Sequence, residues 1–291
     1  MNELIAGLIK DGPVLTDGSW GSQMMKRGLK AGVAPDSWNL TDPDKVEEIA
    51  RQYVDAGSRI ILTNTFGANR FVLGKFGMAD KVVEINKKGV EISKKAAAGK
   101  AHVFASIGPS GKLLITRDVT EEDLMAAFVE QALAIAAAGA DAIVVETMMD
   151  LNEARIAATA AKETGLPVIT CLVFDAGKNK DRTMIGNTIE QAVETLTGVG
   201  VDGIGANCGQ GIEGFIPICK RMRVATTLPL WMKPNAGSPE VIDGQTVYGT
   251  SATDFARHIP ALIEAGANFI GGCCGTDMEF IIEAKNALKG I

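Results

Sequence analysis

Three of the five cysteines stand in segments that could form a metal site. Cys273 and Cys274 are adjacent within Gly271-Gly-Cys-Cys-Gly-Thr, and Cys208 follows Asn207 in a separate segment. Consecutive residues of a regular strand point to opposite faces, so two adjacent thiols can bind one ion only where a strand ends, and the flanking glycines allow such a break. Three thiolates from two strand ends fit a tetrahedral zinc ion whose fourth position stays open. The sequence therefore predicts a zinc site.

A packing role or a vicinal disulfide is the alternative interpretation of the adjacent pair. Cys171 and Cys219 are interpreted as buried packing residues, because one lies in a predicted strand and the other on a predicted helix. Five cysteines in 291 residues are too few for a disulfide framework, which favours a reducing compartment.

The ligand set predicts a particular chemistry. A zinc ion held by three thiolates carries net negative charge, which makes it a poor electrophile toward water. It can instead bind an incoming thiol and lower the pKa of that thiol, so that a thiolate exists at neutral pH. The predicted reaction is alkyl transfer to sulfur.

A phrase that recurs four times predicts the elements that position these residues. In each copy an apolar helical segment ends at a glycine and a short apolar strand follows. The glycines are Gly57, Gly139, Gly200 and Gly266, and the helices are expected over residues 44–56, 121–138, 189–199 and 254–265. With further apolar runs, eight strand candidates lie near residues 14, 60, 103, 143, 168, 203, 230 and 269. Buried strands that alternate with helices predict one (β/α)8 TIM barrel domain over residues 1–291, with a doubly wound sheet as the alternative.

The segments that follow the predicted strands are polar or rich in glycine. In a barrel of this kind the reacting groups lie at the carboxyl ends of the strands, so all of these segments are expected on one rim. They are Asp17-Gly-Ser-Trp-Gly, Thr63-Asn-Thr-Phe-Gly, Gly108-Pro-Ser, Glu146-Thr-Met-Met-Asp, Phe174-Asp, Asn207-Cys-Gly, Lys233-Pro-Asn-Ala-Gly and Gly271-Gly-Cys-Cys-Gly-Thr.

Taken together, these motifs resemble those of the homocysteine S-methyltransferase family over essentially the whole chain. The resemblance implies a zinc-dependent (β/α)8 barrel in which Cys208, Cys273 and Cys274 bind Zn²⁺ and take part in catalysis through it. It also implies that two carboxylates hold the amino group of homocysteine in a charge-assisted arrangement. The substrate-binding residues that the resemblance implies are Asp17, Glu146, Asn64, Thr65, Asn207 and Asn235.

Some of these assignments have structural alternatives. Asp17 before Gly18 is also typical of a turn, and Glu146 could be an exposed strand end. Asn235 matches a polar residue that fills the fourth metal position when no thiol is bound, although Asn before Ala-Gly is also an ordinary turn.

The sequence departs from the family pattern in two places. Leu62 stands where many methionine synthase modules have an acid, which predicts a less polar pocket there. The aromatic residues of the betaine-specific enzymes are missing from Gly32-Val-Ala-Pro and from the segment after Glu146. A quaternary ammonium group favours an aromatic cage, which only Trp20 and Trp38 could offer here, so betaine is disfavoured as the methyl donor.

Charge and hydropathy exclude several classes of partner. The net charge is −6 and the basic residues are scattered, which argues against nucleic acid. Apolar runs such as 132–138 are too short to span a membrane, and residues 1–10 lack the pattern of a secretory leader, so we expect a cytoplasmic protein. The corrinoid-binding pattern Asp-x-His-x-x-Gly surrounds neither His102 nor His258. The methyl donor is then expected to be a free small molecule or methylcobalamin on a separate corrinoid protein.

Three hypotheses follow. The leading one is a zinc methyltransferase that activates homocysteine and methylates it from a separate corrinoid protein to give methionine. The second is the opposite direction of methyl transfer, in which a methyl group moves from an O-, N- or S-methyl compound to a partner corrinoid protein. The third is a thiol sensor or scaffold, which has no need of an open metal site.

Overall fold

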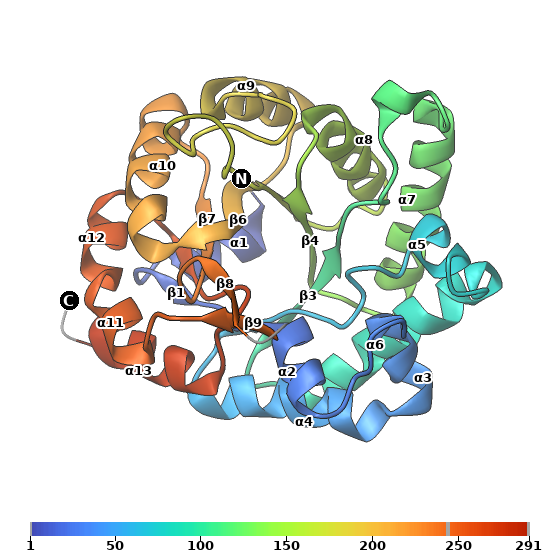
Figure 1. Cartoon of the computed structure of the whole chain (residues 1–291), viewed down its shortest axis with the longest axis horizontal. Coiled ribbons are helices and arrows are strands. Elements are labelled where there is room, and N and C mark those ends of the chain that lie inside the picture. The colour runs from blue at the N-terminus through green and yellow to red at the C-terminus, as the bar shows by residue number, and fades with distance from the viewer. Residues whose placement is uncertain (1, 243–244, 290–291) are drawn as a thin grey trace.

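Eight parallel strands form the centre of the molecule in the computed structural model, which describes residues 2–242 and 245–289. The strands pair in the order β1, β10, β7, β6, β5, β4, β3, β2, and every pairing is parallel. Their bounds are β1 Val14–Leu15, β2 Ile60–Ile61, β3 His102–Ile107, β4 Ala142–Met148, β5 Val168–Leu172, β6 Gly203–Gly211, β7 Leu230–Asn235 and β10 Phe269–Ile270. The predicted (β/α)8 barrel is confirmed (Figure 1).

The first and last strands of this order face each other across a seam. The Arg59 amide donates to the Leu15 carbonyl (2.8 Å), and the Ser58 hydroxyl donates to the Thr16 carbonyl (3.0 Å). The Leu62 amide then donates to the carboxylate of Asp17 (2.7 Å). A side chain thereby continues the hydrogen bonding between β1 and β2 where the backbone ladder stops.

Helices surround the strands as an outer ring (Figure 1). The ring contains α4 Pro43–Ala56, α6 Val82–Ala97, α7 Glu121–Ala137, α8 Leu151–Lys162, α9 Ile189–Val199, α10 Ile212–Ala225, α11 Ala252–Arg257, α12 Ile259–Glu264 and α13 Met278–Leu288. Shorter helices are α1 Glu3–Ile9, α2 Trp20–Lys26, α3 Trp38–Thr41 and α5 Arg70–Gly74, with single 3-10 turns at Pro35–Ser37, Ala79–Lys81 and Leu114–Thr116. No helix in the described ranges combines the length and the apolar character needed to cross a membrane.

Local sequence signals explain where the ring helices begin and end. The four glycines of the repeated phrase all have positive φ, from 81° at Gly200 to 110° at Gly57, as the predicted helix ends require. At the start of α7, Thr120 and Asp123 form a capping box. These signals fix the helix ends concerned without any tertiary contact.

One predicted helix is wrong in its extent. The segment expected to be helical over 254–265 is divided at His258 into α11 and α12. Pro260 follows the division, and because proline has no amide hydrogen it cannot donate to the carbonyl one turn earlier. A two-stranded hairpin, β8 Pro239–Ile242 and β9 Gln245–Tyr248, was not expected either, and it extends from the loop after β7.

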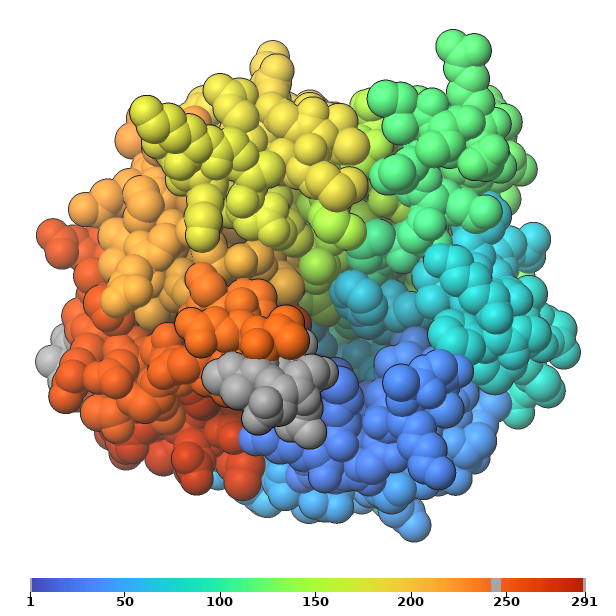
Figure 2. Space-filling view, viewed as in Figure 1, coloured from blue at the N-terminus to red at the C-terminus, as the bar shows by residue number. Residues whose placement is uncertain are grey.

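Two apolar layers hold the barrel together. The inner one fills the barrel, where the Trp231 ring lies 6.0 Å from Phe104 and 5.2 Å from Phe269 between ring centroids. Ile5 and Leu8 of α1 join this cluster, so α1 covers the amino end of the barrel. The larger outer layer lies between strands and ring helices. The carboxyl ends of the strands face the viewer in Figure 2, where the surface is hollowed beside the β8–β9 hairpin.

The approach of β6 to β7 gives a test of the barrel. A methyl group at Gly205 would overlap the backbone oxygen of Trp231, which cannot move without disturbing β7. We expect Gly205→Ala to lower the free energy of unfolding by about 3 kcal/mol, as measured by urea denaturation. Gly198 on α9 has open space around it, so Gly198→Ala is the control and should raise stability by about 0.5–1 kcal/mol. Equal stability of the two variants would contradict the close approach.

Candidate metal centre

The three predicted cysteines meet at the carboxyl end of the barrel. Cys208 lies in β6, and Cys273 and Cys274 lie in the loop after β10. Their sulfur atoms are all within 4.8 Å of one another, and those of Cys208 and Cys274 are 3.8 Å apart. Zn–S bonds of about 2.3 Å in a tetrahedron place the sulfur atoms about 3.8 Å apart. The cluster therefore fits a thiolate-bound ion such as zinc.

The loop that carries the adjacent cysteines is held by backbone hydrogen bonds. β10 ends at Ile270, before the cysteines, as the prediction of a break requires. The Cys273 amide donates to the Pro234 carbonyl (2.7 Å), and the Cys274 carbonyl accepts from the Ala236 amide (2.9 Å). Gly275, with φ of 83°, then turns the chain away. Both thiols can thus face the same point because neither residue is part of a regular strand.

The three thiols differ in acidity. Hydrogen bonds from Cys208 and Cys273 lower the pKa of Cys274 to about 3, whereas the pKa of Cys273 is raised by its thiol neighbours and by burial. The hydrogen bond with Cys273 acts to lower the pKa of Cys208, but the hydrogen bond with Cys274 and burial outweigh it, so that the pKa is raised. One thiolate held by two thiols is an arrangement that a cation would stabilise further, because it would allow all three groups to ionise.

Two neighbours complete the surroundings of the thiols. The Asn235 side-chain oxygen accepts a hydrogen bond from the Cys274 amide (3.1 Å), so the structure brings this predicted residue to the cluster. Tyr248 of β9, which the sequence analysis did not single out, lies against Gly275 and acts to lower the pKa of Cys274. Its position depends on the unexpected hairpin, which explains why spacing alone could not reveal it.

Glu146 lies at the end of β4 and is 7% exposed. Its carboxylate accepts from the Ser106 hydroxyl (2.5 Å) and lies 3.4 Å from the side-chain nitrogen of Asn207. Burial raises the pKa of this carboxyl, and nearby Lys233 acts in the opposite direction. The structure therefore places a buried carboxylate near the thiols and not an exposed strand end, while its contact with substrate stays a prediction.

Asp17 is buried completely and already has three hydrogen-bond donors. They are the Lys233 ammonium, the Trp20 indole (2.8 Å) and the Leu62 amide (2.7 Å). Burial acts to lower the pKa of Lys233, but Asp17 and Glu146 outweigh burial, so that the pKa is raised and the ammonium stays charged. Direct contact of Asp17 with substrate stays a prediction, while the observed partner of this carboxylate is Lys233.

Asn64 and Thr65 are used to hold the loop after β2. The Asn64 amide donates to the Pro35 carbonyl (2.9 Å), and the Thr65 hydroxyl donates to the Ser106 carbonyl (2.7 Å). Both side chains are buried, and their contact with substrate stays a prediction. Leu62, expected to make the pocket less polar, instead packs inside the barrel.

Both tryptophans considered for an aromatic cage are already engaged in contacts within the protein. The Trp20 indole is bonded to Asp17, and Trp38 is buried in the outer apolar layer. That betaine is disfavoured as the donor stays a prediction.

Lys233 and Ser106 are site residues that sequence reasoning missed. Lys233 was quoted only as part of a motif, yet a lysine within the apolar run Leu-Trp-Met-Lys-Pro of a central strand is itself a signal, because a buried ammonium requires an anionic partner. Ser106 had no such signal within its strand.

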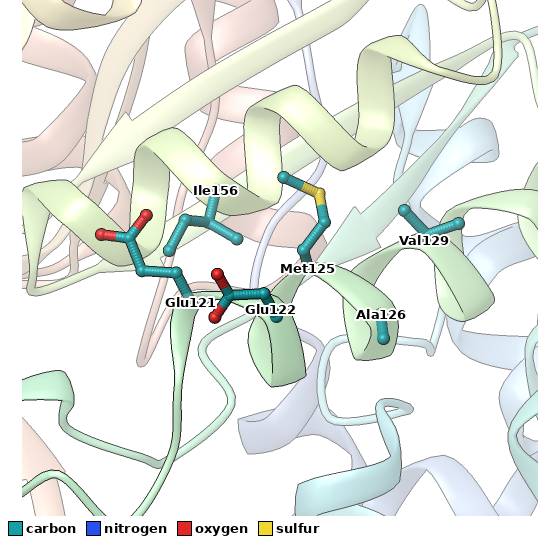
Figure 3. Close-up of a pocket in the computed structure, with 6 residues that line it drawn as sticks. All are labelled: Glu121, Glu122, Met125, Ala126, Val129 and Ile156. Atoms are coloured by element: carbon teal, nitrogen blue, oxygen red, sulfur yellow. The ribbon is translucent and has the colours of Figure 1, made fainter.

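A groove on the outside of the barrel lies away from this site. Figure 3 shows it between α7 and α8, where Met125, Val129 and Ile156 form an apolar floor beside Glu121 and Glu122. None of its lining residues is a thiol or a base paired with a nucleophile, so its residues do not extend the chemistry of the metal centre.

Comparisons with known proteins identify relatives of the whole chain. The chain is 29% identical to a methionine synthase of Mycobacterium leprae over 290 residues, covering 94% of this chain and 24% of the relative. It is also 29% identical to a methionine synthase of Mycobacterium tuberculosis over 296 residues, with the same coverage. The chain thus spans about a quarter of the length of these relatives.

The fold has a solved counterpart. The metallated form of the homocysteine methyltransferase MmuM from Escherichia coli superposes with a TM-score of 0.80 at 23% identity, covering 98% of this chain and all of that one. A family model described as homocysteine S-methyltransferase matches residues 14–288. The chain therefore belongs to the homocysteine S-methyltransferase family, and it is a methyltransferase.

Proposed function

We propose that this protein is a zinc-dependent methyltransferase that methylates the sulfur of homocysteine and releases methionine. The observation that carries the proposal is the cluster of three thiols with a buried carboxylate beside it. A family member of the same fold has been solved in a metallated form, which supports a metal here. We place the protein in the cytoplasm, where free thiols persist.

The chain's own residues would hold the substrate at two ends. Cys208, Cys273 and Cys274 supply three corners of a tetrahedron and leave one for the substrate sulfur, with Asn235 beside the cluster as the group that gives way. Bound zinc would lower the pKa of the substrate thiol, so that a thiolate is available at neutral pH. Glu146 would accept hydrogen bonds from the substrate ammonium, a charge-assisted contact.

We assign Asp17 an indirect part in substrate binding. Its carboxylate is occupied by Lys233, which leaves Glu146 as the carboxylate to pair with the substrate. Asn64 and Thr65 would act in the same indirect way, since Thr65 holds the strand that carries Ser106, and Ser106 in turn orients Glu146. A direct contact with bound substrate is proposed for Glu146, and Asn235 is the group that the substrate sulfur displaces.

The transfer itself needs alignment of the two reactants. An electron pair on the substrate sulfur forms the new S–CH₃ bond while the bond from the methyl group to its donor breaks, and that pair stays with the donor. Holding the sulfur and the ammonium at separate points fixes the direction of the sulfur lone pair, which favours in-line attack. The donor must approach from the carboxyl end of the barrel, because the thiols lie at the end of β6 and after β10, and this end is the hollowed face in Figure 2.

We further propose that the donor is methylcobalamin carried by a separate corrinoid protein. Large apolar side chains are exposed in the segments after five of the strands, and such side chains are typical of a surface that a protein partner covers. They are Phe66, Leu113, Ile115, Met149, Met184, Ile185, Val241 and Val247. A small donor would need no such surface. The relatives named methionine synthase are about four times longer than the matched region, which leaves room for other modules in them.

Metal analysis with calorimetry tests the proposal. We expect about one zinc per chain, lost in Cys208→Ala, because two thiols cannot hold the ion. Zinc-loaded protein should bind L-homocysteine with proton release near neutral pH, since the bound thiol ionises. Cys219→Ala is the control, because Cys219 is buried on α10 away from the cluster, and it should retain zinc. Protein without zinc, or zinc-loaded protein that does not bind homocysteine, would refute the proposal.

Removing the charge of Glu146 tests amino-group binding. Glu146→Gln should weaken L-homocysteine binding about 10- to 100-fold, and it should leave the binding of 4-mercaptobutyrate, which lacks the amino group, almost unchanged. Burial raises the pKa of Glu146, so in the wild type the preference for homocysteine should be present above that pKa and lost as the pH falls through it. Equal weakening of both thiols would assign Glu146 a general structural role.

A charge on the exposed apolar surface tests the donor. Ile115 is 78% exposed on the loop after β3, whereas Val224 is 90% exposed on ring helix α10. Ile115→Glu should lower kcat/KM for a methylated corrinoid protein about tenfold, because a charge would have to be buried in the contact. The rate with free methylcobalamin should not change, and Val224→Glu should affect neither rate. Equal behaviour of the two variants would favour a small-molecule donor.

A further inference from the structure

Two strands are distorted where they reach the metal centre. The register of β4 shifts between Val145 and Met148, and that of β6 shifts between Asn207 and Gly211. At each shift one residue that is not glycine has a left-handed backbone, Thr147 with φ of 61° and Cys208 with φ of 64°. Such a conformation is unfavourable for any side chain and rare for a β-branched one, so surrounding contacts must maintain it.

The side chain of Asn207 joins the two distortions across β5. Its oxygen accepts from the Thr147 amide (2.7 Å), and its nitrogen donates to the Thr147 hydroxyl (2.7 Å). These two bonds hold both the backbone and the side chain of one residue. The same nitrogen lies 3.4 Å from Glu146 and 3.7 Å from the Cys273 sulfur.

The Asn207 amide has no free group to offer a substrate. It is completely buried, its oxygen has a donor, and its nitrogen is surrounded by acceptors within the protein. Both ends of this contact are next to a site residue along the chain. Thr147 directly follows Glu146, and Asn207 directly precedes Cys208. A contact between Asn207 and Thr147 therefore fixes the backbone on which the carboxylate and one thiol are mounted.

We propose that Asn207 and Thr147 form a positioning clamp that sets Glu146 and the Cys208 thiol at the spacing needed to hold the ammonium and the sulfur of one substrate. The proposal rests on the proposed function for the identity of that substrate. Neither residue of the clamp is assigned a contact with the reacting atoms. The clamp replaces the sequence-based expectation that Asn207 donates to the substrate directly.

The experiment removes one hydroxyl and compares two thiols. Thr147→Val deletes the hydroxyl that accepts a hydrogen bond from the Asn207 side-chain nitrogen, while Thr147→Ser keeps this hydroxyl. Thr170→Val is a matched control, because Thr170 lies on β5 between the clamped strands and its buried hydroxyl has no hydrogen-bond partner. Thr147→Gly is added because glycine adopts the left-handed backbone freely, so this variant loses the hydroxyl without a folding penalty.

Calorimetry should show a loss of selectivity. In zinc-loaded Thr147→Val and Thr147→Gly, affinity for L-homocysteine should fall about tenfold while affinity for 4-mercaptobutyrate changes little, because Glu146 no longer meets the amino group. Thr147→Ser and Thr170→Val should keep the wild-type preference. A role in stability alone would change the unfolding midpoint and leave the preference intact.

A second readout needs no substrate. The thiolate-to-metal absorption bands of the cobalt(II)-loaded protein should shift in Thr147→Val and stay unchanged in Thr170→Val, since Cys208 moves with the clamp. Unchanged bands, or a wild-type preference in Thr147→Val, would overturn the clamp. A wild-type protein without any preference for homocysteine would instead refute the proposed function, and the cobalt bands would still decide whether the clamp exists.

Discussion

Three charged side chains are buried together beneath the thiols, and their charges do not balance. Lys233 carries one positive charge, and Asp17 and Glu146 carry one negative charge each. Asp17 binds the ammonium directly, whereas Glu146, among the described residues, accepts hydrogen bonds only from a hydroxyl and an amide and is affected by Lys233 through its charge. One shared cation does not offset the burial of two carboxylates, and the pKa of Glu146 is raised by that burial. The unbalanced charge is the physical basis of the proposed pairing between Glu146 and the substrate ammonium.

The barrel keeps these three charged side chains from exchanging partners. Lys233 is on β7 and Glu146 is on β4, and each of these strands is paired with another strand on both sides. Asp17 accepts a hydrogen bond from the Leu62 amide across the seam of the barrel. Exchanging partners would break that seam contact together with the ion pair. Water cannot easily relieve the charge of Glu146, because the side chain is 7% exposed. The fold thus prevents the rearrangement that would satisfy the carboxylate internally.

The sequence predicted what depends on local geometry and missed what depends on tertiary contact. Glycines such as Gly57 and Gly200 have the positive φ that their position after a helix implied, because this need arises within one turn. The three cysteines were also found, since the ends of barrel strands meet on one rim whatever the loops do. The pairing of Asp17 with Lys233 joins residues 216 positions apart, and no local pattern encodes it. Tyr248 was missed because it is placed by a hairpin outside the repeating pattern.

The thiols and the carboxylate have different parts in the proposed function. Any metal of suitable size and softness would gather Cys208, Cys273 and Cys274, because the sulfur atoms already lie at tetrahedral spacing. An ion bound there would select for a thiol and would not discriminate between thiols. In the proposed function discrimination comes from the distance between the cluster and Glu146, and in the proposed clamp that distance depends on two left-handed residues, Thr147 and Cys208. Backbone strain at Thr147 and Cys208 thus assigns specificity, in this proposal, to the scaffold, while the thiols and the ion that they would hold supply reactivity.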